Sequence, residues 1–222
     1  MIRAIGQTVL PTLTLDIDLR VGSEIVAVVG DNGVGKSTLL RVLAGLQTLS
    51  TGALHIDDIV VDEPATRTFV PPAHRGVAML FQDPLLFPHL NVLDNVAFAL
   101  RRSGTPRNDA RTLARDALEQ FAIAHLAQRA VSNLSGGEAQ RVALARSLVR
   151  TPRAVLLDEP FSSLDRRSRA DFRAMLKESF TELAVPTFIV THDEADITAL
   201  CGRTIHLERT TGFEPATLTL AR

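Results

Sequence analysis

The chain has 222 residues, and its 25 acidic and 24 basic side chains leave a formal net charge of −1. This length allows one domain with a sizeable core, and the balanced charge argues against nucleic acid as a partner. A single cysteine excludes an intrachain disulfide framework. No apolar run approaches the ~20 residues that span a bilayer, so we expect a cytoplasmic protein.

The first third of the chain predicts strands, turns and one helix. Residues 13–19 alternate apolar and polar side chains, which is typical of a half-buried strand. Residues 24–29 are apolar and rich in β-branched side chains, which favours a buried strand, and residues 38–44 have helical spacing. Residues 54–61 predict a hairpin that turns at an Asp-Asp pair, and residues 75–81 predict a further strand.

The pattern becomes helical between residue 83 and about residue 134. Asn91 is a suitable N-cap for the first of two helices. The apolar residues that share a face are Leu93, Val96, Ala97 and Leu100 in the first helix and Leu113, Ala117, Leu118 and Phe121 in the second.

Strands and helices then alternate. Strands are expected at 155–158 and 187–190, and helices at 169–183 and 194–200. This alternation predicts a parallel sheet with crossover helices. Residues 210–222 fit neither pattern, and we expect them to be disordered.

A phosphate-binding motif lies between the strand at 24–29 and the helix at 38–44. The pattern G-x-x-x-x-G-K-[ST] is matched by Gly30-Asp31-Asn32-Gly33-Val34-Gly35-Lys36-Ser37, with Thr38 following. Glycines allow the close backbone approach that a triphosphate needs, and the N-terminus of a helix attracts anions. We expect Lys36 to reach the β- and γ-phosphates and Ser37 to place its hydroxyl on Mg²⁺.

Two acids end the apolar strand at 155–158. Ligands bind at the carboxyl ends of parallel strands, so Asp158 is expected to help hold Mg²⁺ and Glu159 to act as general base toward water. An ordinary acidic turn is the alternative, and the phosphate-binding motif makes it the weaker one.

A second glycine motif, Leu134-Ser135-Gly136-Gly137-Glu138, opens a strongly helical stretch and forms another helix N-terminus. With the two motifs above, it resembles the ATP-binding subunits of ABC transporters, whose signature is Leu-Ser-Gly-Gly-Gln. The resemblance covers about residues 1 to 208. It implies a P-loop NTPase (RecA-like) α/β fold with a parallel sheet core, an N-terminal antiparallel β subdomain and an inserted helical subdomain at about 83–134. Residues 1–222 would form a single ATP-binding domain.

Three further motifs appear in the order of that family. Gln82 matches the glutamine loop, which is implied to sense Mg²⁺ and the attacking water. Asp165 lies in the D-loop, and His192 matches the switch histidine, implied to contact the γ-phosphate. The resemblance also implies that two copies pack head to tail around ATP, with Ser135, Gly136 and Gly137 of one copy at the phosphate loop of the other.

The resemblance implies a membrane partner as well. The chain would lie on the cytoplasmic face of the cell membrane, bound to a permease and served indirectly by a periplasmic or extracellular binding protein. Residues 87–90 are candidates for docking on the permease, with local core as the alternative. Residues 75–90 are similar to bacterial importers, and the molybdate and sulfate group is the nearest in pattern.

Several alternatives stay open. A thiamine-type importer and an exporter or lipoprotein-extracting ATPase are the main rivals, whereas a DNA-repair or ribosomal ATPase would need a coiled-coil insertion or a second cassette. The family usually stacks an aromatic residue on adenine. This chain has no Trp or Tyr and its first Phe is Phe69, so residues 9–11 are expected there, and GTP could be used.

Overall fold

The computed structural model describes residues 1–162, 164–209 and 216–221. They form two compact units. The first unit takes in residues 1–79, residues 152–159 and the described residues from 176 onward. The second, helical unit takes in residues 80–151 and the described residues of 160–175. The helical segment expected at 83–134 lies within this second unit.

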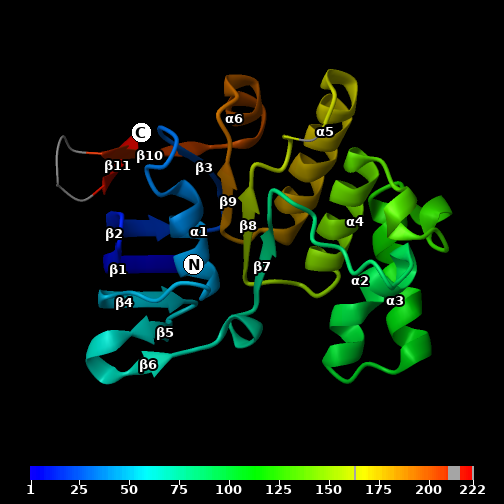
Figure 1. The fold of residues 1–222 in the computed structure, drawn as a ribbon, viewed down its shortest axis with the longest axis horizontal. Helices are drawn as coiled ribbons and strands as arrows, with labels where there is room; N and C mark the ends of the chain where they lie inside the picture. The colour runs from blue at the N-terminus through cyan, green and yellow to red at the C-terminus, as the bar shows by residue number, and fades with distance from the viewer. Residues whose placement is uncertain (163, 210–215, 222) are drawn as a thin grey trace. The chain divides into compact units, whose positions relative to one another are not determined.

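Strands form one mixed sheet in the order β6-β5-β4-β1-β2-β11-β10-β3-β9-β8-β7 (Figure 1). The strands are β1 (Ile2–Leu10), β2 (Leu13–Val21), β3 (Ile25–Val29), β4 (Thr51–Ile56), β5 (Ile59–Glu63), β6 (Thr68–Phe69), β7 (Val77–Leu80), β8 (Ala154–Asp158), β9 (Thr187–Val190), β10 (Arg203–Arg209) and β11 (Ala216–Ala221). β10, β3, β9 and β8 run parallel, whereas β1 pairs antiparallel with β2 and β4, and β4 with β5. The predicted fold class is therefore confirmed.

Six α-helices are described. They are α1 (Lys36–Ala44), α2 (Val92–Arg102), α3 (Arg107–Gln120), α4 (Gly136–Leu148), α5 (Arg166–Leu183) and α6 (Glu194–Leu200). Short 3₁₀ turns lie at Pro64–Thr66, Pro72–His74, Ala124–Leu126 and Val131–Asn133. Among these helices, none combines the length and the apolar character that crossing a membrane would require.

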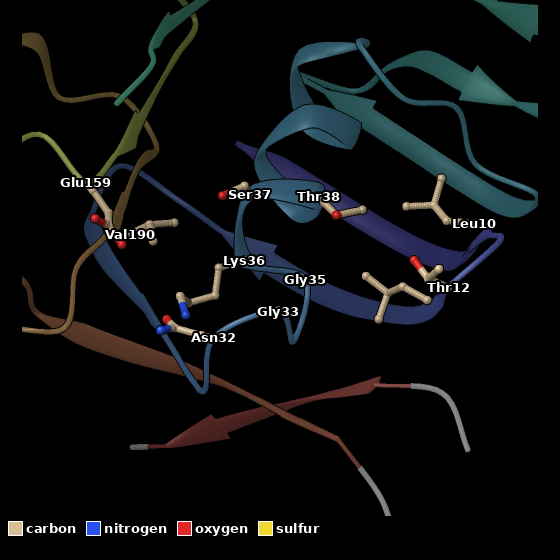
Figure 2. A pocket seen from close by; sticks show the side chains of 11 residues that line it. Leu10, Thr12, Asn32, Gly33, Gly35, Lys36, Ser37, Thr38, Glu159 and Val190 are labelled. Atoms are coloured by element: carbon tan, nitrogen blue, oxygen red, sulfur yellow. The ribbon is translucent and has the colours of Figure 1, made fainter. Parts of the chain in front are cut away.

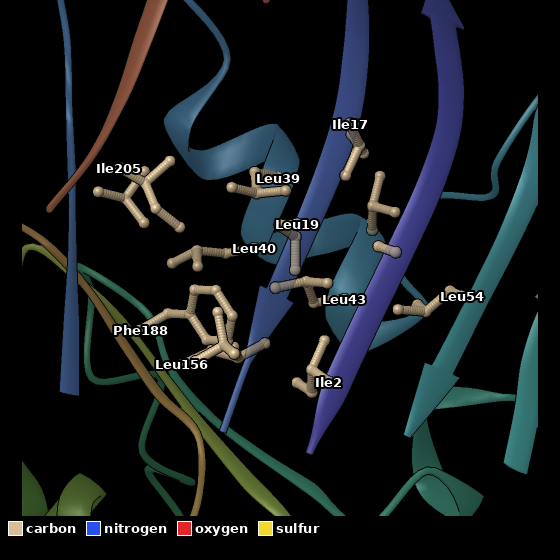
Figure 3. Close-up of a cluster of buried hydrophobic side chains, with 14 of the residues drawn as sticks. Ile2, Ile17, Leu19, Leu39, Leu40, Leu43, Leu54, Leu156, Phe188 and Ile205 are labelled. Carbon is tan, nitrogen blue, oxygen red and sulfur yellow. The ribbon is translucent and has the colours of Figure 1, made fainter. Parts of the chain in front are cut away.

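The core of the first unit lies between α1 and the sheet. Leu39, Leu40 and Leu43 of α1 are fully buried, and Figure 3 shows them beside side chains from several strands, including Leu156 and Phe188. The i, i+1, i+4 spacing of the three leucines gives α1 one apolar face. Because that face is packed, the N-terminus of the helix is held at the carboxyl ends of the parallel strands.

A buried arginine closes the other end of α1. Arg75 is only 1% exposed, and its guanidinium donates hydrogen bonds to the carbonyls of Val42 (2.9 Å) and Val70 (2.7 Å). It also lies 3.7 Å from the carboxylate of Asp62. Burial lowers the pKa of Arg75 and raises the pKa of Asp62. The strand expected at 75–81 begins only at Val77, because Arg75 belongs to this network.

The helical unit follows the predicted capping. The side chain of Asn91 accepts a hydrogen bond of 2.8 Å from the amide of Asp94 at the start of α2. The buried face of α3 differs in part from the expected one. Leu118 and the C-cap residue Phe121 are buried as expected, but Leu113 is 46% exposed and Ala110 and Ala114 are fully buried. Small side chains on that face allow α3 to pack close to α2 and α4.

The expectation of a disordered tail is wrong for the described residues 216–221. They form β11, which pairs antiparallel with β10 and contacts β2 in parallel at Leu15. The sequence Ala-Thr-Leu-Thr-Leu-Ala alternates with period two, which is the pattern of a strand. Residues 210–215 and 222 lie outside the described residues.

Candidate nucleotide-binding site

The phosphate loop joins β3 to α1 through backbone that only glycine adopts readily. Gly30 has φ +147°, and a Cβ there would lie 2.3 Å from the carbonyl oxygen of Leu207. Gly35 has φ +115° and is the N-cap of α1, whose amide groups open toward the loop. The glycines are therefore required by this turn, and the turn presents a helix N-terminus of the kind that binds anions.

Lys36 lies inside the curve of the loop. Its ammonium donates hydrogen bonds to the carbonyls of Gly30 (2.7 Å) and Asp31 (2.9 Å). These bonds hold the cation among the exposed backbone groups of residues 31–33. A polyphosphate lying along the loop would meet that charge directly.

Ser37 and Asp158 come together from distant parts of the chain. The hydroxyl of Ser37 donates a hydrogen bond of 3.1 Å to the carboxylate of Asp158 at the end of β8. Burial raises the pKa of Asp158, the charge of Glu159 raises it further, and the bond from Ser37 lowers it. The half-buried carboxylate and the hydroxyl therefore offer a metal ion two oxygen ligands side by side.

That donor pair fits Mg²⁺ completed by phosphate and water. Magnesium is usually held in proteins by one or two carboxylates together with substrate phosphates. In the described part of the chain, no cluster of three or more His, Cys, Asp or Glu is placed to hold a metal by itself. The residues present therefore suit a metal that arrives with a nucleotide, and Ser37 and Asp158 would hold it.

Glu159 has a strained backbone. Its φ is +47°, in the left-handed region, and its amide donates a hydrogen bond of 3.1 Å to the carbonyl of Val190 at the end of β9. Such strain in a residue other than glycine costs of order 1–3 kcal/mol and is common at functional sites. The bend turns the chain away at the strand end and leaves Glu159 lining the pocket described next.

A pocket of about 390 Å³ joins these groups. Its lining residues are Leu10, Thr12, Leu13, Asn32, Gly33, Gly35, Lys36, Ser37, Thr38, Glu159 and Val190. In Figure 2, Glu159 and Val190 lie at one side, Leu10 and Thr12 at the other, and the loop with Lys36 lies between them. The pocket is thus lined by six of the residues expected to bind the nucleotide, all in or just after the phosphate loop, and by Glu159, the predicted general base.

Other predicted residues of the first unit lie elsewhere. Val34 is 2% exposed and belongs to the hydrophobic core, so its side chain holds the loop against the core. Gly30 and Asp31 contribute the carbonyls that hold Lys36. His192 is exposed and does not line the pocket; it precedes Asp193, whose side chain caps α6.

The remaining predicted residues belong to the helical unit. Gln82 is exposed just after β7. Asp165 accepts hydrogen bonds from the amide and the hydroxyl of Ser168, at 3.0 and 2.6 Å, in the first turn of α5. Ser135 is exposed at the N-terminus of α4. Each of these roles stays a prediction.

The signature motif forms a capping box. The hydroxyl of Ser135 donates to the carboxylate of Glu138 at 2.8 Å, and the amide of Glu138 donates to Ser135 Oγ at 3.3 Å. Hydrogen bonds from the amide and hydroxyl of Ser135 lower the pKa of Glu138. A Cβ on Gly137 would lie 2.9 Å from Cδ2 of Leu164, the mobile end of a flexible side chain. Glu138 therefore preserves the helix start that the signature requires.

Sequence reasoning missed part of the lining. Leu13 and Val190 were not expected in the site, and Thr12 lies just beyond the residues 9–11 considered for the base. The sequence offers only one signal for these residues, which is that each lies at a hairpin turn or at the end of a strand. Which hairpin faces the phosphate loop is decided by the long-range pairing of β1, β2 and β4.

The sheet order and the glycine loop before α1 together define a P-loop nucleotide triphosphatase fold. The sequence pattern of the family described as "ABC transporter" matches residues 14–162. The chain therefore belongs to the ABC transporter family.

Curated relatives are import ATP-binding proteins by name. The sn-glycerol-3-phosphate import protein UgpC of Psychromonas ingrahamii is 39% identical over 93% of this chain and 53% of its own length. The Fe(3+) ions import protein FbpC of Streptomyces avermitilis is 44% identical over 90% of this chain and 55% of its own. The trehalose/maltose import protein MalK of Thermococcus litoralis is 40% identical over 84% and 50%. The chain spans about half the length of these relatives.

Two solved structures share the fold. The ATP-binding cassette MJ0796, described as a dimer in a post-hydrolysis state bound to ADP and Pi, has a TM-score of 0.79 at 26% identity, covering 94% of each chain. The cbiO1 protein of Clostridium perfringens, described as part of the ABC transporter complex cbiONQ, has a TM-score of 0.78 at 28% identity and covers 92% of this chain and 83% of its own.

Proposed function

We propose that the chain binds ATP with Mg²⁺ and hydrolyses it as the nucleotide-binding subunit of an ABC importer. The observation that carries this proposal is one pocket in which Lys36, Ser37 and Glu159 meet, with Asp158 bonded to Ser37. A loop alone would bind phosphate; a loop with an acid pair at the end of a neighbouring strand is equipped to cleave it.

Binding rests on the loop and on Lys36. The amides at the start of α1 and the ammonium of Lys36 would contact the phosphates. Ser37 and Asp158 would hold Mg²⁺, which would neutralise part of the charge of the phosphates. For the cation to serve the phosphates, Lys36 would exchange at least part of its bonding to the carbonyls of Gly30 and Asp31. The lysine is thus aimed into the loop before any phosphate is added.

Hydrolysis needs a base beside the phosphates. Glu159 lines the pocket at the end of β8, where its carboxylate can accept a proton from water as the water attacks. The backbone bond to Val190 anchors this residue between two parallel strands. We assign the base to Glu159 and leave the metal to Asp158, because Asp158 is already bonded to Ser37.

The working unit is proposed to be a dimer with membrane partners. Ser135, Gly136 and Gly137 of a second copy would complete the site, and Gln82, Asp165 and His192 would act as the family motifs imply. One structural relative is described as dimeric, and another as part of a transporter complex. A permease, reached at the cytoplasmic face of the membrane, and a binding protein would complete the importer.

The cargo stays open among importer substrates. The relatives named above concern glycerol phosphate, iron and maltose. The expectation of molybdate or another oxyanion therefore remains a prediction from motif resemblance. The import direction is supported by the word "import", which all three names contain.

The test of the proposal compares the two lysines of the chain. Lys36→Ala is expected to weaken ATP binding and abolish hydrolysis, because the point charge on the β- and γ-phosphates is lost. Lys177→Ala removes the same charge from an exposed position on α5 and should leave both unchanged. Binding is measured by calorimetric titration with Mg-ATP and turnover by phosphate release. Normal turnover in Lys36→Ala would refute the proposed function.

A further inference from the structure

The loop between β9 and α6 passes from buried residues to an exposed histidine. β9 ends at Val190, which is 1% exposed and pairs with Val28 on one side and Asp158 on the other. Thr191 follows and is 4% exposed, whereas His192 is exposed. The chain is therefore held in the core up to the residue that precedes the predicted switch histidine.

The hydroxyl of Thr191 links the two sides of His192. It accepts a hydrogen bond of 3.2 Å from the amide of Asp193, and it donates one of 3.2 Å to the carboxylate of Asp196. A hydroxyl has one donor and two acceptor positions, so it can make both bonds at once. Because Thr191 and Asp193 flank the histidine, this one group fixes the backbone before and after it.

Asp196 is a fully buried acid in the first turn of α6. The helix already has its N-cap in Asp193, whose side chain accepts a hydrogen bond of 2.8 Å from the amide of Ala195. A buried carboxylate is costly unless hydrogen bonds compensate for its lost water, and the Thr191 hydroxyl supplies one. Asp196 therefore does not serve as the cap of α6, and its carboxylate instead anchors the Thr191 hydroxyl.

The imidazole of His192 has no such anchor of its own. Among the described residues, none is hydrogen-bonded to it. Its direction is therefore set by the backbone of residues 191–193. A displacement of about 1 Å in a group that acts on the reacting atoms can slow a reaction ~100-fold, so the bonds of Thr191 bear directly on where the imidazole can act.

We infer that Thr191 and Asp196 are positioning residues for hydrolysis: Asp196 holds the Thr191 hydroxyl, and Thr191 holds the backbone that aims His192 at the γ-phosphate. These roles rest on the proposed function, in which His192 contacts that phosphate. Neither Thr191 nor Asp196 lines the pocket. Their contribution is therefore expected in the rate of the chemical step and not in the affinity for nucleotide.

Thr191→Val tests the role of the hydroxyl, because it keeps the branched shape of the side chain. Turnover at saturating Mg-ATP is expected to fall by about tenfold to a hundredfold. The dissociation constant for Mg-ATP should stay within about threefold of normal, since an interaction used only in the chemical step was removed. Thr191→Ser restores the hydroxyl and should recover most of the turnover. Phosphate release and calorimetric titration on the whole chain measure the two quantities.

Thr187→Val is the matched control. Thr187 is fully buried at the start of β9, and its hydroxyl donates a hydrogen bond of 3.2 Å to the carbonyl of Val185. This variant also loses a buried hydroxyl, but at the end of the strand that is far from His192. Its turnover should stay within about threefold of normal. Thermal melting of both valine variants shows whether they cost similar stability.

The decisive measurement combines Thr191→Val with His192→Ala. If Thr191 acts through the imidazole, adding Thr191→Val to His192→Ala should change turnover by less than about threefold. A purely structural role would lower turnover by the same factor in both backgrounds, because independent effects on free energy add. Asp196→Leu removes the other partner of the bond and should give the same pattern, so the test does not depend on a single variant that folds.

Two results would overturn the inference while leaving ATP hydrolysis by this chain in place. One is turnover within about threefold of normal in both Thr191→Val and Asp196→Leu. The other is an equal loss from Thr191→Val with and without His192. If the unmodified chain neither binds nor hydrolyses Mg-ATP, the proposed function fails and the inference fails with it.

Discussion

At the scale of single residues, Asp158 lies where the folded chain disfavours a negative charge. Burial and the charge of Glu159 raise its pKa above the ordinary value of 3.8. The folded state therefore binds this proton more tightly than the unfolded state, and ionisation costs stability as the pH rises above the unfolded value. A bound Mg²⁺ would offset that cost.

Asp158→Asn tests this balance. The variant should melt at a higher temperature than the unmodified chain at pH 7.5 without nucleotide, and the difference should shrink as the pH falls below the ordinary value of 3.8. Mg-ATP should raise the melting temperature of the unmodified chain but much less that of the variant. Melting curves at both pH values provide the measurement. A variant that is less stable at pH 7.5 would contradict the prediction.

Glu159 is predicted to act on the chemical step and not on binding. Glu159→Gln keeps the size of the side chain and removes the base, so hydrolysis should slow by about 10²–10⁴-fold while ATP affinity changes little. Single-turnover hydrolysis and a binding titration separate the two effects. Glu194→Gln, an exposed acid in the first turn of α6, is the control for loss of one charge. Hydrolysis within about threefold of normal would remove Glu159 from this role.

At the scale of elements, a loop in the helical unit is held by side chains that belong to helices. Asn95 of α2 is fully buried and bonds both the amide (2.8 Å) and the carbonyl (3.1 Å) of Phe87. Arg146 of α4 donates to the carbonyls of Pro84 (3.0 Å) and Leu85 (2.9 Å), and its guanidinium lies 5.3 Å from the centre of the Phe87 ring. Two helices thus fix the segment that follows Gln82.

Arg146→Gln is expected to loosen this segment. Two hydrogen bonds from a charged donor and one cation–π contact would be lost, which should lower the free energy of unfolding by about 1–3 kcal/mol. Arg146→Lys should recover only part of it, because an ammonium lacks the fork that reaches both carbonyls. Urea denaturation gives the comparison, with Arg150→Gln, an exposed arginine just after α4, as the control. Equal losses in the two glutamine variants would contradict the role of Arg146.

The same segment contains the residues predicted to dock on a permease. Phe87 packs against Phe98 in a tilted arrangement with ring centres 4.5 Å apart, and Pro88 and His89 are exposed. Side chains of α2 and α4 therefore hold the segment in place, while part of the segment remains exposed to solvent. Docking remains a prediction, and the alternative of local core applies to Phe87 more than to the exposed Pro88 and His89.

Elements with a local signal could be predicted from the sequence, and those specified by distant partners could not. The hairpin at 54–61 is predicted from the Asp57-Asp58 pair between two apolar runs, and the structure gives this pair the positive φ values, +50° and +64°, of a tight turn. The phosphate loop was predicted because its chemistry needs glycines at set positions. The network of Arg75 and the lining residue Leu13 depend on contacts between segments far apart in the chain. β11 has a local signal too, because apolar and polar residues alternate along Ala216–Ala221.

At the scale of the whole molecule, the N-terminus of α4 is a second helix N-terminus that could bind phosphate. The capping box of Ser135 and Glu138 already satisfies the hydroxyl and two amides, and Ser135 remains exposed. A second copy that brings its ATP to this end of α4 would compete with Glu138 for the hydroxyl. Nucleotide shared between two copies then favours the dimer by mass action.

Glu159→Gln should therefore accumulate a dimer in the presence of Mg-ATP, because slow hydrolysis delays its separation. Adding Ser135→Arg should abolish that dimer and leave ATP binding by the monomer intact, since the bulky cation obstructs only the incoming partner. Losing the cap also costs about 0.5–2 kcal/mol of helix stability, so melting curves accompany the test. Ser132→Arg places the same charge on an exposed serine three residues earlier and should keep the dimer. Size-exclusion chromatography with and without nucleotide decides between these outcomes. A dimer content that ignores nucleotide in every variant, or a loss of monomer binding in Ser135→Arg, would refute the shared site.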